Sequence, residues 1–91
     1  MDLKNAVGIV TGSSSGVGAA TVRLLASKGC NVVVNYSSSK DAAQKVAQDC
    51  ESMDVEVICC QADVSSDEDC RRMVGAAMDK WGKIDALVNN A

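Results

Sequence analysis

The chain has 91 residues, enough for one small domain, with 47% hydrophobic and 23% charged residues, as in ordinary globular proteins. The net charge is −3 and no basic run occurs, so neither nucleic acid nor an anionic membrane surface is expected as a partner. No apolar stretch approaches the roughly 18 residues that a membrane span needs. The N-terminus lacks the basic segment followed by an apolar segment that is typical of a signal peptide. We therefore expect a cytoplasmic protein.

The first half of the chain alternates apolar runs with helical periodicity. Residues 6–10 form an apolar run typical of a buried strand, and residues 31–35 form a second, rich in β-branched side chains. A helix is predicted between them over residues 16–28, ended by Gly29. The face of this helix that we expect to be buried carries Val17, Ala20, Leu24 and Leu25.

The second half repeats the alternation. Helices are predicted over residues 40–53 and 66–81, and strands over residues 55–60 and 84–89. The apolar stripe of the earlier helix is Ala43, Val46, Ala47, Cys50 and Met53, and that of the later one is Cys70, Met73, Val74, Ala77 and Trp81. Ser66 with Asp69 resembles a capping box at the start of the later helix.

The resulting order is β-α-β-α-β-α-β, with strands that read as continuous apolar runs. Such strands indicate an α/β protein in which helices cover both faces of a parallel sheet. Right-handed crossovers favour a Rossmann-like, doubly wound sheet in the strand order 3-2-1-4, with the first two helices on one face and the third on the other. Residues 1–91 would form one domain of this kind.

Five cysteines occur, an odd number, with no C-x-x-C spacing and no histidine beside them. A zinc site is therefore not expected, and reduced thiols fit a cytosolic protein. We expect all five to be buried small hydrophobic side chains: Cys30, Cys50, Cys59, Cys60 and Cys70.

The stretch TGSSSGVG, residues 11–18, falls where the first strand turns into the first helix. Unpaired N–H groups and the helix dipole favour an anion at a helix start, and glycines let the backbone approach a phosphate closely. The stretch therefore predicts a phosphate cradle, and a glycine-rich turn that binds nothing is the alternative. Its spacing differs from both the G-x-G-x-x-G fingerprint and the Walker P-loop.

Three motifs follow one another at the carboxyl ends of strands: Thr11-Gly12-x-x-x-Gly16-x-Gly18, Asp63-Val64 and Asn89-Asn90-Ala91. Together they resemble the cofactor motifs of the classical short-chain dehydrogenase/reductases, and are similar to those of 3-oxoacyl-carrier-protein-reductase-like members. The resemblance covers the whole chain and implies that residues 1–91 form a partial NAD(P)-binding domain, with the C-terminal half of the fold missing.

The resemblance implies specific roles for these residues. The pyrophosphate and the adenosine ribose would be lined by Gly12, Ser13, Ser14, Ser15, Gly16, Val17 and Gly18. Asp63 would accept a hydrogen bond from the adenine amine beside the Val64 amide, or would simply be a charge near the next helix. Asn90, followed by Ala91 in the same motif, would lie near the nicotinamide-side ribose, and it would also suit a buried asparagine that ties neighbouring strands together.

The end of the second strand bears on the choice between NADP and NAD. Asn35, Tyr36 and Ser37, which the resemblance places among the cofactor-binding residues, carry no carboxylate there, and none follows before Asp41. A carboxylate would bind the ribose 2′-hydroxyl and repel a 2′-phosphate, so NADP is favoured while NAD stays possible. Ser15 is an argument against NADP, because many NADP-preferring members of the family carry a basic residue at this position.

Family chemistry, by resemblance, is hydride transfer between the nicotinamide and a carbonyl or alcohol substrate, carried by a serine and a Tyr-x-x-x-Lys pair. Tyr36 and Lys40 match the bare pattern but lie on the adenosine side, so we reject them as the catalytic pair. The chain thus looks like the cofactor-binding part of an oxidoreductase, inactive alone, whose full-length relatives are usually homo-oligomers. The alternatives are a non-catalytic dinucleotide-binding module and a methyltransferase that uses S-adenosylmethionine.

Overall fold

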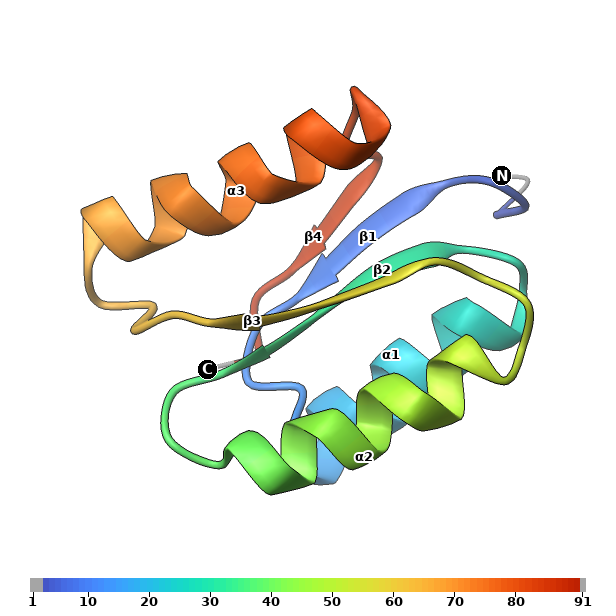
Figure 1. Cartoon of the computed structure of the whole chain (residues 1–91), viewed down its shortest axis with the longest axis horizontal. Coiled ribbons are helices and arrows are strands. Elements are labelled where there is room, and N and C mark those ends of the chain that lie inside the picture. Colours follow the sequence, from blue (N-terminus) through green and yellow to red (C-terminus); the bar gives the residue numbers. More distant parts are fainter. Residues whose placement is uncertain (1–2, 91) are drawn as a thin grey trace.

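The computed structural model describes residues 3–90, which form four strands and three helices in the predicted alternation (Figure 1). The strands are β1 (Val7–Val10), β2 (Asn31–Tyr36), β3 (Val57–Gln61) and β4 (Ala86–Val88). The helices are α1 (Gly16–Ser27), α2 (Lys40–Glu51) and α3 (Asp67–Trp81). Each element lies where the sequence predicts it, with ends that differ by up to two residues.

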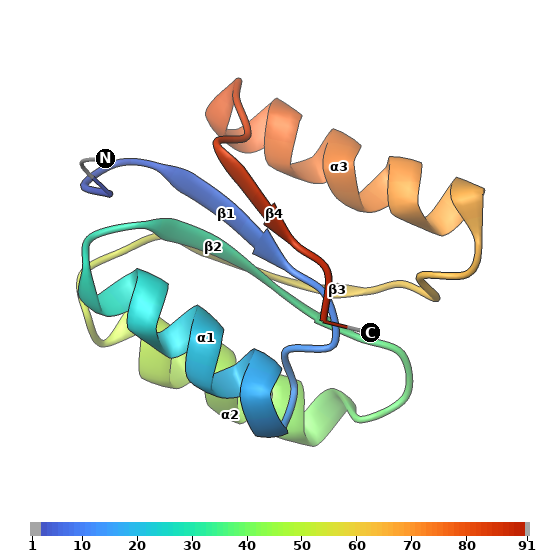
Figure 2. The ribbon, with the colours of Figure 1, turned by 180° about the vertical axis from the view of Figure 1, so that it is seen from behind.

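The sheet has the order β3-β2-β1-β4, and every neighbouring pair of strands is parallel. Helices α1 and α2 cover one face, while α3 alone lies on the other (Figure 1). The view from behind shows β4 ending beside the turn from β1 into α1 (Figure 2). The predicted fold class and strand order are therefore confirmed, and all strands end at one edge of the sheet.

Two apolar clusters fill the spaces on the two faces of the sheet. The larger is built between the sheet and α1 and α2, from residues such as Val10, Val22, Val34, Val46 and Cys50. The smaller packs α3 against the opposite face through Ile9, Val33, Cys60, Met73 and Ala77. Side chains of β1 and β2 alternate between the two clusters, which is why these strands are apolar without a break.

The predicted buried face of α1 is wrong for three of its four residues, and only Leu25 packs against the core, half-buried. The residues of α1 that are buried are Gly18, Ala19, Val22 and Ala26, whereas Val17 is 73% and Leu24 is 59% exposed. Both sets have helical spacing, so periodicity alone could not choose between them. The set with small residues lies inward because α1 approaches the loop before it closely, as the site described below shows.

Three other expectations need correction. Met53 lies beyond the end of α2 and is exposed, although the rest of that stripe is buried. Cys59 is exposed and Cys70 is half-buried, while the other three thiols are buried. Cys59 lies on the edge strand β3, which no further strand covers.

The start of α3 shows half of a capping box. The Ser66 hydroxyl accepts a hydrogen bond from Asp69 N at 3.2 Å. The Asp69 carboxylate does not return this bond; it accepts instead from Asp63 N at 2.8 Å. The cap therefore ties α3 to the loop that follows β3.

None of the helices in residues 3–90 is both long and apolar enough to cross a membrane.

Candidate functional site

The glycine-rich loop between β1 and α1 depends on two left-handed glycines. Gly12 has φ 61° and Gly16 has φ 60°, a conformation that side chains with a Cβ rarely adopt. A Cβ placed on Gly16 would meet no atom within 4 Å, so the loop is open on that side. The sequence thus uses glycine here for backbone turning, and Gly16 leaves room for a ligand.

The first three amides of the loop are already used within the protein, and that of Thr11 donates to Val88 O at 3.0 Å. Gly12 N donates to Asn35 Oδ1 at 2.9 Å, and Ser13 N donates to Asn35 O at 2.9 Å. The Ser13 hydroxyl is fully buried; it donates to Val10 O and accepts from Asn35 N. Ser13 therefore extends the pairing of β1 with β2, and its hydroxyl cannot reach a ligand.

The next five amides have no protein acceptor among residues 3–90: those of Ser14, Ser15, Gly16, Val17 and Gly18. They lie at the start of α1, whose first turn contains no acidic side chain to offset the positive end of the helix dipole. Ser15 is the N-cap, yet its hydroxyl makes no capping bond. This group of amides and hydroxyls is therefore suited to an anion such as a phosphate.

Close packing holds this helix start against the ends of β1 and β4. A Cβ on Gly18 would lie 2.3 Å from Gly12 O and 2.6 Å from Asn90 Nδ2. Asn90 Nδ2 itself donates to Gly12 O at 3.3 Å. Only a residue without a side chain fits at position 18, which accounts for the last glycine of the motif.

A small polar network joins the ends of β1 and β4. The Thr11 hydroxyl accepts from Asn90 N at 2.9 Å and lies 3.2 Å from Asn89 Oδ1, to which it donates. Asn90 therefore ties the ends of β1 and β4 together through its N–H and its Nδ2, although it is half-buried rather than buried. Its role toward a nucleotide stays a prediction, and Ala91 lies outside the described residues.

The three predicted residues at the end of β2 lie in different environments. Asn35 is 2% exposed and points into the protein, whereas Tyr36 is half-buried against the cluster of α1 and α2. Ser37 is exposed, and its carbonyl accepts from Gln61 Nε2 at 3.1 Å. Of the three, Ser37 offers a hydroxyl to solvent.

Asp63 is exposed at the end of β3 and is held in the ionised form. Its Oδ1 accepts from the Ser65 hydroxyl at 2.6 Å and from Ser65 N at 2.9 Å. These two bonds lower the pKa of the Asp63 carboxyl below its ordinary value. Its other oxygen, Oδ2, has no partner among residues 3–90, so it is available as an acceptor.

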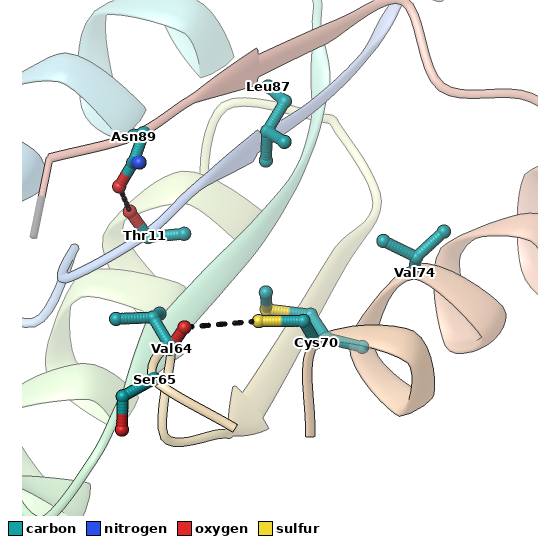
Figure 3. A pocket seen from close by; sticks show the side chains of 8 residues that line it. Thr11, Val64, Ser65, Cys70, Val74, Leu87 and Asn89 are labelled. Atoms are coloured by element: carbon teal, nitrogen blue, oxygen red, sulfur yellow. Dashed lines mark hydrogen bonds between the residues drawn. The ribbon is translucent and has the colours of Figure 1, made fainter. Parts of the chain in front are cut away.

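Two cavities open at this edge of the sheet and share Val64. One, of about 260 Å³, brings together predicted site residues from three strand ends: Gly12, Asn35, Ser37, Asp63 and Val64, with Ala62. The other, of about 310 Å³, is mainly apolar; it lies between α3 and the ends of β1 and β4 (Figure 3). Its lining includes Cys70, whose thiol donates to Val64 O, and Leu87 of β4.

Sequence reasoning assigned no role to Ala62, Ser65 or Asn89, which also take part in the site. Ser65 follows Asp63 by two residues, the spacing at which an aspartate accepts from the backbone in a turn, so this partner had a local signal. Asn89 stood inside a quoted motif. Ala62 carries no polar group, and only the folded chain shows that it lines a cavity.

Comparison with known proteins agrees with this geometry. The family model described as "short chain dehydrogenase" matches residues 6–91. An uncharacterized oxidoreductase of Methylorubrum extorquens is 44% identical over 89 residues, which are 98% of this chain and 36% of that protein. The 3-oxoacyl-[acyl-carrier-protein] reductase FabG of Staphylococcus epidermidis is 38% identical over 87 residues, which are 96% of this chain and 36% of that protein.

Solved structures show the same partial coverage. A mutant Serratia marcescens short-chain dehydrogenase/reductase superposes with a TM-score of 0.93 at 36% identity, over all of this chain and 37% of that one. A hydroxysteroid dehydrogenase from Escherichia coli gives 0.90 at 31% identity, over 98% of this chain and 37% of that one. The chain therefore spans just over a third of the length of these relatives. With the family model matched along nearly its whole length, the chain belongs to the short-chain dehydrogenase family.

Proposed function

We propose that this chain is the cofactor-binding part of an oxidoreductase and binds a nicotinamide dinucleotide at the carboxyl ends of its strands. The observation that carries the proposal is the run of five unpartnered amides from Ser14 to Gly18 at the start of α1. A dinucleotide brings a pyrophosphate whose oxygens match such donors. The cavity lined by Gly12 and Asp63 lies next to them, and its mainly apolar lining, with the Asp63 carboxylate at its edge, suits an adenosine.

The proposed placement assigns each part of the ligand to residues that are free to bind it. The pyrophosphate would accept from the loop amides, with Ser14 and Ser15 adding hydroxyls. The adenine amine would donate to Asp63 Oδ2, beside the Val64 amide. Asn90 would lie toward the nicotinamide-side ribose, as the family resemblance implies.

We propose NADP rather than NAD as the preferred cofactor. Ser37 and the exposed Lys40 follow β2, and the segment after this strand carries no carboxylate before Asp41 to repel a 2′-phosphate; Asp63, which lines the same cavity as Ser37, is assigned to the adenine. The similar protein FabG of Staphylococcus epidermidis is named as a 3-oxoacyl-[acyl-carrier-protein] reductase, and it belongs to the same family as this chain. Along the sequence after the end of β2, the first acidic side chain is that of Asp41, in the first turn of α2.

When bound, the nicotinamide supplies a hydride donor or acceptor for a carbonyl or alcohol substrate. We propose that this chain contributes no catalytic residue of its own. Its sole tyrosine, Tyr36, packs against the cluster of α1 and α2, away from the nicotinamide side. In a longer oxidoreductase the remaining sequence would supply the catalytic residues, the substrate pocket and the contacts of a homo-oligomer. A cytoplasmic location fits the free thiols of the described chain.

Titration calorimetry with NADP+, NAD+ and S-adenosylmethionine tests the proposal. We expect NADP+ to bind more tightly than NAD+, no binding of S-adenosylmethionine, and no oxidation of NADPH with carbonyl substrates. Failure of both dinucleotides to bind would refute the proposal, and turnover would refute its non-catalytic part.

The variant Ser37→Asp sharpens the choice of cofactor. A carboxylate at this cavity should weaken NADP+ binding about tenfold or more through charge repulsion and leave NAD+ binding unchanged or stronger. Ser52→Asp adds the same charge at the end of α2, outside the cavity residues, and should change neither.

A further inference from the structure

The side chain of Asn35 joins three segments of the chain at one buried point. Its Oδ1 accepts from Gly12 N of the glycine loop at 2.9 Å. Its Nδ2 donates to Cys60 O and Ala62 O, both at 3.3 Å, at the end of β3. With 2% exposure, this amide has exchanged water entirely for protein partners.

The partners fix which way the amide points. A backbone N–H can only donate and a carbonyl can only accept, so Oδ1 must face Gly12 and Nδ2 must face Cys60 and Ala62. An asparagine meets this combination of one donor and several acceptors. An aspartate of the same shape would place a carboxylate oxygen against the two carbonyls, which is unfavourable in a buried site.

Asn35 lines the cavity of about 260 Å³ together with residues of two other segments. Gly12 belongs to the loop between β1 and α1, and Ala62, followed by Asp63, belongs to the turn after β3. The Asn35 amide bonds to both segments. Ser13 reinforces the loop side, because it exchanges hydrogen bonds with the Asn35 backbone through its own N–H and hydroxyl.

We propose that Asn35 is a positioning residue of the nucleotide site, whose amide holds the phosphate loop and the Asp63–Val64 turn at the separation that a dinucleotide spans. This inference rests on the proposed binding function and deepens it. Asn35 acts through Gly12 and Ala62 and does not itself bind the ligand through its side chain, since its polar atoms are already engaged. Binding of a ligand that contacts both the loop and the Asp63–Val64 turn therefore depends on Asn35, whereas binding of a ligand that contacts the loop alone does not.

Asn31 provides a matched comparison on the same strand. Its Oδ1 also accepts a backbone N–H, from Glu56 at 2.9 Å, and so also links β2 to the chain beside it. It lies at the opposite, amino end of β2, away from both cavities. Loss of this bond affects stability but leaves the cavity between Gly12 and Ala62 intact.

The test compares two ligands across Asn35→Ala, Asn35→Asp and Asn31→Ala. NADP+ spans the loop and the Asp63–Val64 turn, whereas inorganic pyrophosphate engages the loop alone. We expect both Asn35 variants to lose about tenfold or more in NADP+ affinity, while their pyrophosphate affinity changes less than threefold. The reason is that the substitutions remove one or two buried hydrogen bonds between the loop and the turn after β3, and only NADP+ contacts both segments. Asn31→Ala should leave both affinities within twofold.

Amide hydrogen exchange in the unsubstituted, ligand-free chain provides a measurement that needs no variant. Gly12 N–H should exchange much more slowly than Ser14 N–H, which has no protein acceptor. Equal exchange rates would overturn the inference. So would Asn35 variants that bind NADP+ as the unsubstituted chain does, or that weaken NADP+ and pyrophosphate equally.

Failure of the proposed function gives a different result. In that case the unsubstituted chain binds neither NADP+ nor NAD+, and the positioning role falls with it. Tight binding by the unsubstituted chain with no change on substitution overturns the role of Asn35 alone.

Discussion

Gly18 approaches Gly12 so closely that a Cβ at position 18 would lie 2.3 Å from the carbonyl oxygen of Gly12. The same Cβ would lie 2.6 Å from Asn90 Nδ2, which donates to that carbonyl. The contact joins the start of α1 to the ends of β1 and β4, so one small residue sets the geometry of the loop.

We expect Gly18→Ala to destabilise the fold by about 1–3 kcal/mol, because backbone atoms must move to admit the methyl group. It should also weaken dinucleotide binding. Gly75→Ala is the control: this glycine lies within α3 and a Cβ there meets nothing within 4 Å. It should stabilise the protein by about 0.5–1 kcal/mol, as alanine does in helix interiors. Urea unfolding of the two variants measures both effects, and equal changes would contradict this account.

The serine caps of two helices give a second matched pair. Ser66 accepts from Asp69 N at the start of α3, whereas Ser39 at the start of α2 makes no side-chain cap. Ser66→Ala should therefore cost about 1 kcal/mol and Ser39→Ala much less. Thermal unfolding of the two variants compares them directly. A larger loss for Ser39→Ala would show that the caps are assigned wrongly.

Asp85 should contribute to acid sensitivity. Its Oδ2 accepts from Val7 N at 2.8 Å and lies 3.2 Å from Lys83 Nζ, and these partners lower the pKa of the Asp85 carboxyl. A carboxyl with a lowered pKa in the folded state stabilises the fold above its unfolded pKa, about 4. That contribution is lost as pH falls from there through the folded pKa.

Asp85→Asn removes this titration while its amide oxygen can still accept from Val7. Its stability should therefore fall less than that of the unsubstituted chain between pH 6 and pH 3, as measured by unfolding midpoints. Some acid sensitivity should remain, because hydrogen bonds also lower the pKa of Asp49, through Arg23, and of Asp63, through Ser65. Identical pH dependence in the two proteins would exclude a role for Asp85.

The thiols should react in the order of their exposure. Cys59 is exposed and Cys70 half-buried, whereas Cys30 and Cys50 are 2% and 0% exposed. Burial raises the pKa of the Cys59 thiol as well as those of Cys30 and Cys50, so the expected order follows from exposure and not from the thiolate fraction. Iodoacetamide at pH 8, read by peptide mass spectrometry, should label Cys59 and Cys70 before the other two, with the variant Cys60→Ser to resolve the adjacent Cys59. Early labelling of Cys30 or Cys50 would contradict the core described here.

Much of the fold could be predicted because strand and helix patterns alternate without a break, and crossover handedness then leaves one natural strand order. The buried face of α1 could not be predicted in this way. Leu24 and Val17 are larger and more apolar than Ala19 and Ala26, yet the small residues lie inward, and Gly18 on the same face lies against the preceding loop. Size and hydrophobicity misled the prediction because close backbone approach selects small residues.

Prediction of the site was similarly uneven. Motif spacing placed the glycine loop, Asp63 and Asn90 at one sheet edge, since parallel strands end together. Spacing could not show that Ser13 and Asn35 turn their polar groups inward, because rotamers and partners depend on the folded chain. These two residues thus hold the loop with their side-chain polar groups, while their predicted contact with a ligand stays a prediction.

The central claim is that the start of α1 and the Asp63–Val64 turn bind one dinucleotide together. Titration of the isotopically labelled chain with NADP+, followed by residue-resolved amide NMR spectra, tests it most directly. The account predicts shifts of the Ser14–Gly18 and Val64 amides in one saturable process, with Asn31 unmoved. Shifts confined elsewhere, or none at saturating NADP+ and NAD+, would contradict it.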